Sequence, residues 1–235
     1  MVSKEQIKNS LKRFHFYSGI QIEVLPASEK EAFKKFGKKI VLSRRKILFK
    51  QGSFPTGIYI LKSGKLKVYQ TNSDGSIQVL FIYTIGDVFG YRPILSNDYQ
   101  PATVAALEDS ELLFIERKNF INLIVKSVSI SNQLLISLSR EFTVLTNRIT
   151  LFAQRGIKER FAIVLLILNE KYKSDKESIS EITLSRTDLA NFVGTSVESL
   201  SRMINVFKTK KLIKTEGKKI VIENIRELYL LSAID

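Results

Sequence analysis

Apolar and polar positions alternate with a helical period near the C-terminal end of the chain. At spacings of three and four residues, an apolar stripe is formed by Val197, Leu200, Ile204 and Phe207. The positions between them carry short or hydrogen-bonding side chains. A shorter helix is predicted over residues 184–193, capped by Ser185 and joined to the second helix through Gly194. Two short helices, a glycine turn and a polar outer face predict a helix-turn-helix that reads DNA.

The segments around these two helices complete a small domain. An amphipathic helix is predicted over 157–172, before the pair. After the pair, strands at 212–215 and 219–222 flank a turn at Glu216-Gly217, and a short helix at 225–231 closes the chain. The hairpin is typical of a wing, so residues 154–235 are predicted to form a winged helix-turn-helix DNA-binding domain.

Residues 40–116 are predicted to form strands. Short runs rich in Ile, Val, Leu, Phe and Tyr are separated by glycines at intervals of 11 to 12 residues: Gly52, Gly64, Gly75 and Gly86. Asp74-Gly75 is a strong hairpin signal between two of these runs. The pattern predicts a roll or barrel of antiparallel strands, and residues 1–128 are assigned to this β-roll domain.

From about Phe120 the period becomes helical, and a long helix is predicted over 129–153. An apolar seam with spacings of 3, 4, 3, 4 and 3 runs along it: Leu135, Leu138, Phe142, Leu145, Ile149 and Phe152. We interpret it as a dimerisation helix, because two-fold symmetry suits a DNA reader. The alternative is a helix that packs against its own domain. The predicted fold class is therefore α+β: β-roll, dimerisation helix, winged helix.

The outer face of the second helix offers side chains suited to base edges. Arg202 can donate two hydrogen bonds to guanine, Glu198 can accept one from cytosine, and Ser201 can contact a base edge or a thymine methyl. The alternative is an intrahelical Glu198–Arg202 ion pair on a solvated face. We expect contacts to the DNA backbone from a second group of residues: Arg186, Thr195, Ser196, Ser199, Lys208, Lys218 and Lys219.

Charge and composition agree with a nucleic-acid partner. The net charge is +14, and from Arg202 to Lys219 there are 7 basic residues and one acid. The first 50 residues carry 13 Lys and Arg against 4 acids, which we interpret as a solvated basic surface, with a second nucleic-acid contact as the alternative. One histidine, no cysteine and scattered acids assemble no catalytic or metal site. With no apolar run long enough for a membrane and no signal-type segment, a cytoplasmic protein is expected.

The stretch Leu184 to Ile213 resembles the signature of the Crp/Fnr family of bacterial transcription regulators, which carries Glu-x-x-Ser-Arg on the recognition helix. Glu198, Ser201 and Arg202 match those positions. In the family an arginine before the glutamate marks readers similar to the cyclic-AMP receptor. Val197 stands there instead, which is similar to the Fnr side and implies palindromic sites with TTGA-like half-sites. The order of β-roll, long helix and winged helix is also the family's.

Gly86-Asp87-Val88-Phe89-Gly90 resembles the start of the family's phosphate-binding cassette. A cyclic-nucleotide binder then supplies a glutamate and, further on, an arginine. Here Tyr91 stands at the glutamate position, and Gln100-Pro101-Ala102-Thr103 replaces the segment with the arginine. The effector is therefore not expected to be cyclic AMP. A candidate effector pocket is nevertheless assigned to Phe89, Gly90, Tyr91, Arg92, Gln100, Ala102 and Thr103.

The sequence also restricts which other cofactors the protein could bind. The absence of cysteine excludes an Fnr-type Fe–S cluster, and the sole histidine, His15, is expected to be a packed or surface residue rather than a haem ligand. The expected partners are double-stranded DNA, a second copy of the chain, RNA polymerase if the protein is an activator, and an optional small effector. Two alternatives stay open: a regulatory module that acts through a protein partner, and a true cyclic-nucleotide-responsive regulator.

Overall fold

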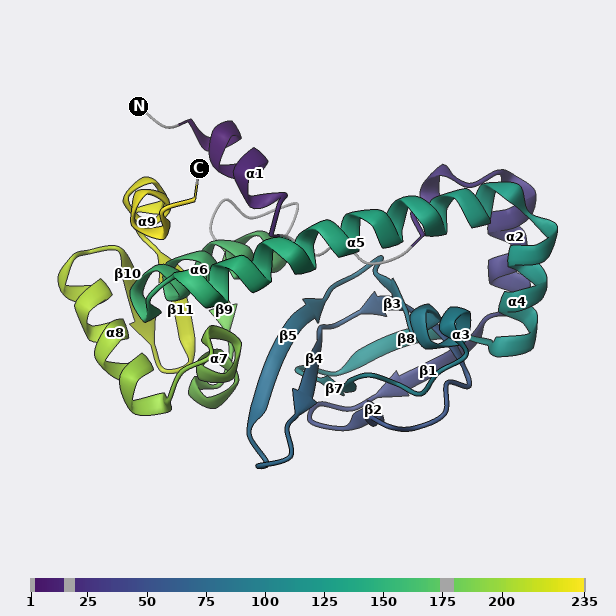
Figure 1. The fold of residues 1–235 in the computed structure, drawn as a ribbon, viewed down its shortest axis with the longest axis horizontal. Coiled ribbons are helices and arrows are strands. Elements are labelled where there is room, and N and C mark those ends of the chain that lie inside the picture. The colour runs from purple at the N-terminus through teal and green to yellow at the C-terminus, as the bar shows by residue number, and fades with distance from the viewer. Residues whose placement is uncertain (1–2, 15–19, 174–179, 235) are drawn as a thin grey trace. The chain divides into compact units, whose positions relative to one another are not determined.

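The structure, a computed structural model, describes residues 3–14, 20–173 and 180–234. Its contacts divide the chain into two compact units (Figure 1), Tyr17–Phe142 on one hand and Met1–Phe16 together with Thr143–Asp235 on the other. These units are not the three domains predicted above, with boundaries at 128/129 and 153/154. That functional division therefore stays a prediction.

The unit Tyr17–Phe142 contains two four-stranded antiparallel sheets, with strand orders β1-β8-β3-β6 and β2-β7-β4-β5. The strands are β1 Lys38–Leu42, β2 Ile47–Phe49, β3 Gly57–Ser63, β4 Leu66–Thr71, β5 Ile77–Tyr83, β6 Val88–Phe89, β7 Thr103–Ala106 and β8 Ser110–Glu116. The hairpin of β4 and β5 turns through the predicted Asp74-Gly75. The antiparallel β architecture predicted for residues 40–116 is confirmed.

Aromatic rings fill the interior between these strands. Phe89 stacks on Tyr83 with ring centres 4.2 Å apart and on Tyr59 at 5.5 Å. Tyr59 also contacts Phe114, with ring centres 5.1 Å apart. Such ring pairs contribute beyond the area that they bury, so the β-roll has a packed aromatic centre.

Short helices flank the sheets: α2 Ala27–Phe36, α3 Tyr91–Ser96 and α4 Arg117–Lys126, preceded by the 3-10 turn Ile22–Val24. Phe33 of α2 and Phe120 of α4 are buried in one cluster with Tyr91. The sequence patterns predicted neither α2 nor α3, since both are short, with one buried residue in α2 and three in α3.

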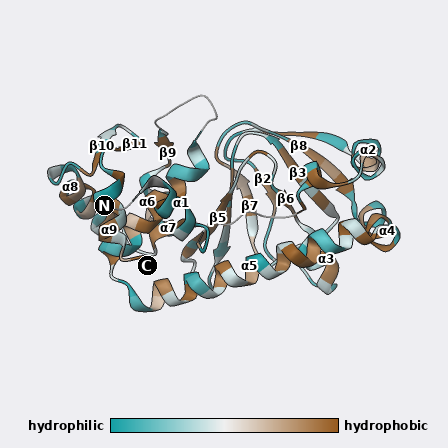
Figure 2. Ribbon diagram, turned by 90° about the horizontal axis from the view of Figure 1, so that it is seen from above, coloured by the Kyte–Doolittle hydropathy of each residue, from teal (hydrophilic) through white to brown (hydrophobic). Residues whose placement is uncertain are grey.

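The long helix α5, Val128–Gln154, begins and ends one residue outside the predicted 129–153. Most of the apolar seam is exposed, with Phe142 73% and Ile149 70% accessible, while Leu138 and Phe152 are half-buried. Beside the seam, one residue earlier at each position, runs a buried stripe formed by Leu134, Ser137, Glu141, Val144, Arg148 and Leu151. Figure 2 shows hydrophobic and hydrophilic segments alternating along α5. The helix thus has one face buried within the chain and one apolar face that is mostly exposed.

The other unit contains the winged helix. Its elements are α6 Ile157–Tyr172, β9 Ile182–Thr183, α7 Arg186–Val193, α8 Val197–Thr209, β10 Ile213–Glu216, β11 Lys219–Ile222 and α9 Ile225–Ser232. Residues 161–169 of α6 are buried and form the centre of the domain. The predicted hairpin is present, and β9 extends it to a three-stranded sheet of order β10-β11-β9.

The N-terminal helix α1, Lys4–Leu11, belongs to the same unit. Its Ile7 and Leu11 are buried, it packs against α9, and the Tyr229 hydroxyl donates to Ser10 Oγ at 2.8 Å. The expectation of a purely solvated basic surface therefore holds only for one side of this helix.

None of the helices in the described part of the chain is, taken singly, long and apolar enough to cross a membrane. Only α4 and α5 taken together reach that length and composition, and they are bent by 105° at their junction.

Candidate functional site

Side-chain caps fix the two helices of the helix-turn-helix. Ser185 precedes α7 and its hydroxyl accepts from the Asp188 N–H, as predicted. Gly194 ends α7 with φ of 71°, a left-handed conformation that suits glycine. Ser196 then caps α8 by accepting from the Ser199 N–H at 3.1 Å. The turn between the helices is thus defined by residues that the chain itself supplies.

The predicted apolar stripe anchors α8 in the domain. Leu200, Ile204 and Phe207 are buried, and the Phe207 ring lies 4.8 Å from that of Phe161 in α6. Val197 is half-buried. Because this side faces the core, the opposite side of α8 is presented to solvent.

The three predicted base-contact residues, Glu198, Ser201 and Arg202, are all exposed on α8. The pKa of Glu198 is lowered, first by its own backbone N–H, then by the Ser196 hydroxyl, with a smaller contribution from the Arg202 charge. Arg202 donates to Ser199 Oγ at 3.2 Å, and Ser201 Oγ donates to the Val197 carbonyl at 2.8 Å. The exposed face therefore carries an anion, a cation and a hydroxyl held by short-range bonds.

The residues predicted to contact the DNA backbone differ in the hydrogen bonds and ion pairs that they form within the chain. Lys208 and Lys218 are exposed. The Arg186 guanidinium donates to the Gly217 carbonyl at 3.0 Å and so ties the start of α7 to the wing turn, and partial burial lowers its pKa. Lys219 forms an ion pair with Glu181 at 2.6 Å, which raises the pKa of Lys219. Thr195, Ser196 and Ser199 lie in the turn and the first turn of α8.

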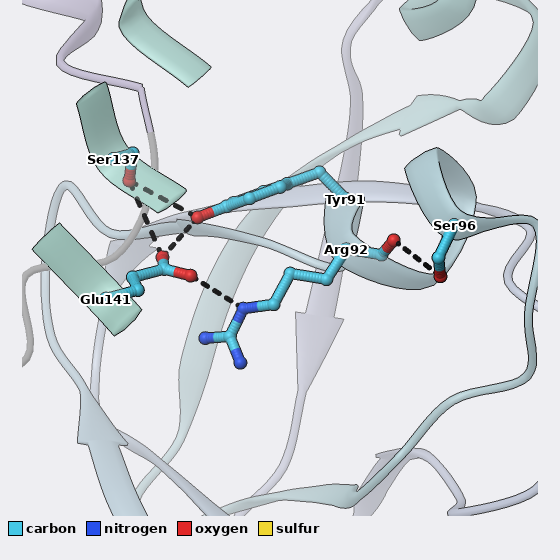
Figure 3. Close-up of polar contacts among 5 residues, drawn as sticks. All are labelled: Tyr91, Arg92, Ser96, Ser137 and Glu141. Carbon is cyan, nitrogen blue, oxygen red and sulfur yellow. Dashed lines mark hydrogen bonds and ion pairs between the residues drawn. The ribbon is translucent and has the colours of Figure 1, made fainter. Parts of the chain in front are cut away.

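The predicted effector residues Tyr91 and Arg92 lie on α3 and point toward α5 (Figure 3). The Tyr91 hydroxyl donates to the Glu141 carboxylate and lies 3.3 Å from Ser137 Oγ. Arg92 Nε lies 2.7 Å from the second carboxylate oxygen of Glu141, which is 3% exposed. We call these four residues the α3–α5 cluster: Tyr91, Arg92, Ser137 and Glu141.

Burial and neighbouring charges both shift the pKa values of the α3–α5 cluster. It raises the pKa of Tyr91, and the neighbouring Glu141 charge raises it further. Burial acts to lower the pKa of Arg92, but the Coulombic effects of Tyr83 and Glu141 outweigh it, so this pKa is raised. The raised pKa keeps the Tyr91 phenol protonated at neutral pH, and the Glu141 carboxyl group lies between this phenol and the Arg92 guanidinium.

The remaining residues of the predicted pocket have other partners. The backbone of Gln100 exchanges hydrogen bonds with Gly52 and Ser53, and Thr103 Oγ1 accepts from the Gln51 N–H at 3.0 Å. Phe89 and Ala102 are buried in the β-roll. Gly90 starts α3 with φ of 88°, and a Cβ there would lie 3.0 Å from the Gly57 carbonyl oxygen. The predicted set is thus divided between a group tied to α5 and a group tied to the loop before β3.

Sequence reasoning missed Ser137 and Glu141, which lie 46 and 50 residues from Tyr91. A signal existed, because the buried stripe repeats along α5 with the same spacings as the apolar seam. Because Ser137, Glu141 and Arg148 in this stripe are polar, a search for apolar periodicity does not detect the stripe.

Among the described residues no cluster of three or more His, Cys, Asp or Glu side chains is able to hold a metal ion. The prediction for His15 lies outside the described residues.

Two family profiles match the chain. The cyclic nucleotide-binding domain matches residues 39–127 and the Crp-like helix-turn-helix domain matches residues 159–231. The chain is 29% identical over 189 residues to the fumarate and nitrate reduction regulatory protein of Vibrio cholerae, covering 80% of this chain and 75% of that protein. It is 28% identical over 197 residues to the anaerobic regulatory protein of Aggregatibacter actinomycetemcomitans, covering 83% and 76%.

Solved structures share the fold. FixK2 from Bradyrhizobium japonicum superposes with a TM-score of 0.77 at 20% identity, over 85% of this chain and 98% of that one. The regulator CLP from Xanthomonas campestris superposes with a TM-score of 0.71 at 21% identity, over 85% and 100%. Both of these relatives are named regulatory proteins, which agrees with the expectation of a protein that is not an enzyme. The chain belongs to the Crp/Fnr family of DNA-binding transcription regulators.

Proposed function

We propose that the protein binds, as a homodimer, a palindromic DNA site with TTGA-like half-sites through the exposed face of α8. The observation that carries this proposal is the joint exposure of Glu198, Ser201 and Arg202 on a helix whose other face is buried. Arg202 would donate to guanine O6 and N7, Glu198 would accept from a cytosine amino group, and Ser201 would contact a neighbouring base. Val197 before Glu198 favours the TTGA-like half-site over that of the cyclic-AMP receptor.

The proposed backbone contacts surround this face. Lys208 and Lys218 are exposed and would neutralise phosphates, and Thr195, Ser196 and Ser199 would donate hydroxyl hydrogen bonds. Arg186 and Lys219 already have partners in Gly217 and Glu181, so their contribution would be to hold the wing beside the backbone as well as to supply charge.

The apolar seam of α5 supports the proposed homodimer. Phe142 is 73% exposed and belongs to a long row of exposed apolar side chains on α5. Exposing such a row to water costs free energy in a monomer, and a second copy of α5 would cover it. A Phe142→Glu variant is expected to sediment as a monomer at micromolar concentration, where the parent sediments as a dimer. A parent that is monomeric under those conditions would contradict the homodimer.

The effector is proposed to be something other than cyclic AMP. At the position where a cyclic-nucleotide binder carries a glutamate, Tyr91 instead bonds to Glu141, and Arg92 is paired with the same carboxylate. A cyclic phosphate would have to compete with this internal carboxylate for Arg92, and the arginine that the family supplies further along the chain is missing here. Titration calorimetry with cyclic AMP is expected to give no heat of binding, and a micromolar affinity would contradict this.

Binding to a designed duplex tests the DNA reading directly. A labelled duplex with two inverted TTGA half-sites is titrated with the protein and compared with a duplex of the same composition whose half-sites are scrambled. We expect at least about a hundredfold preference for the palindrome, which is modest for a specific regulator. Equal affinities would refute the proposed site. The protein would act in the cytoplasm, and would contact RNA polymerase if it is an activator.

A further inference from the structure

One arginine joins the end of α5 to the turn of the helix-turn-helix. Arg160 lies in the first turn of α6, where its N–H donates to the Gly156 carbonyl. Its Nη2 donates to the carbonyl of Gly194 at 3.0 Å, and its Nη1 donates to the carbonyl of Phe152 at 3.5 Å. The guanidinium carbon also lies 5.7 Å from the centre of the Phe152 ring.

A hydrogen bond to the Gly194 carbonyl acts on the turn between α7 and α8. Gly194 is the left-handed residue that ends α7, and its own N–H is bonded to the Ala190 carbonyl. The recognition helix α8 begins three residues later at Val197. A bond to this carbonyl therefore fixes where α8 starts. The planar fork of a guanidinium can serve two carbonyls at once, which a single ammonium group cannot do with the same geometry.

A second arginine, Arg148, also connects α5 to the helix-turn-helix. The guanidinium of Arg148 on α5 lies 5.3 Å from the centre of the Phe192 ring on α7. Arg148 is 8% exposed, and burial lowers its pKa to about 10, so it is still a cation at neutral pH. Both contacts lie inside the compact unit that contains Thr143–Asp235. The end of α5 and the helix-turn-helix are thus built as one body rather than as two parts joined at Gly156.

We propose that Arg160 is a positioning residue for DNA recognition, which fixes α8 relative to the end of the apolar seam at Phe152. In a dimer the seam sets the two-fold axis, so this link sets the separation of the two recognition helices and hence the half-site spacing that is accepted. The inference rests on the proposed function, because it requires two half-sites. Arg160 itself need not touch DNA.

The test compares half-site spacings. Three labelled duplexes are used: two inverted TTGA half-sites with centres about one helical turn apart, the same half-sites moved apart by about two base pairs, and a single half-site. The variants are Arg160→Met and Arg160→Lys, with Lys158→Met as the matched control that removes one charge from the same turn of α6. Thermal unfolding shows whether Arg160→Met folds. If it does not, Phe152→Leu replaces it in the test, because this variant removes the ring that the Arg160 guanidinium contacts.

The parent is expected to prefer the one-turn spacing over the moved one by at least about tenfold, and Lys158→Met to keep that ratio. Arg160→Met should lose about tenfold on the one-turn duplex, as expected for removed charged hydrogen bonds, and keep its affinity for the single half-site. The affinity of Arg160→Lys for the one-turn duplex should lie between those of the parent and Arg160→Met.

Several results would overturn the proposal. An unchanged spacing ratio in Arg160→Met and Phe152→Leu would do so. An equal loss on all three duplexes would assign Arg160 to a phosphate contact if the salt dependence falls with it, or to a general structural role if the melting temperature falls instead. A parent that does not distinguish two half-sites from one would refute the proposed function itself.

Discussion

The recognition helix α8 and the short helix α3 both present an arginine, but the two side chains have opposite surroundings. Arg202 on α8 is exposed and donates a hydrogen bond to the Ser199 hydroxyl. Arg92 on α3 is paired with Glu141, a carboxylate that is almost fully buried. The first arrangement leaves donors available to a large anionic partner, while the second satisfies the charge within the chain. The DNA-reading end is therefore organised for a partner, and the β-roll end is closed on α5.

Removing the open arginine should have the largest effect. Arg202→Ala is expected to weaken binding to the two-half-site duplex by about 1–3 kcal/mol per half-site, because a bidentate guanine contact is lost. Fluorescence anisotropy at fixed salt measures this. Lys208→Ala is the control: as a phosphate contact it should weaken binding to all sequences and reduce the salt slope by about one. If Arg202→Ala binds as well as the parent, Arg202 does not read a base.

Breaking the closed pair should act on stability instead. Glu141→Gln leaves the Arg92 charge without its carboxylate, and the free energy of unfolding should fall by about 1–3 kcal/mol, less than for a fully buried pair because Arg92 is 31% exposed. Urea denaturation measures the change. Arg140→Gln, on the exposed side of the same helix, should leave the midpoint unchanged. The double variant Arg92→Met/Glu141→Gln should regain part of the loss, and strictly additive losses would argue against a coupled pair.

A smaller change tests how α8 holds its open arginine. Ser199→Ala removes the hydroxyl that accepts from Arg202, and affinity for the two-half-site duplex should fall by about 0.5–1 kcal/mol, as for one exposed hydrogen bond. Thr209→Ala removes a hydroxyl that bonds to the Asn205 carbonyl near the other end of α8 and should have no effect on DNA binding. An equal effect of both substitutions would show that the loss comes from the helix as a whole.

The smallest expected effect is a pH dependence that stays flat. The lowered pKa of Glu198 keeps this carboxylate ionised below the ordinary range of glutamate. A group with a lowered pKa loses its charge only as the pH falls through that lowered value, so the difference in DNA affinity between the parent and Glu198→Gln should stay constant from about pH 8 down to about pH 4.5, where an ordinary glutamate is about half protonated. A difference that falls by about half or more between about pH 6 and pH 4.5 would contradict the lowered pKa.

The parts of the molecule that sequence predicted well are those built from neighbouring residues. The cap at Ser185, the turn at Gly194 and the stripe of α8 are local, and each lies where its pattern predicted. The β4–β5 hairpin follows from Asp74-Gly75 in the same way. Local chemistry is enough to define such elements.

The parts that sequence did not predict depend on distant partners or on geometry between elements. Glu141 meets Tyr91 across 50 residues, and Tyr229 meets Ser10 across 219. The 105° bend between α4 and α5 has no glycine or proline to mark it. Polar residues in a buried stripe look like a solvated face until the partner that satisfies them is known.

The central claim, that a dimer of this chain reads a palindrome through α8, is tested most directly by selection from a pool of random duplexes with the full chain, followed by sequencing of the bound fraction. We expect enrichment of two inverted TTGA-like half-sites with centres about one helical turn apart. A pool without an enriched motif, or with a single unpaired half-site, would contradict it.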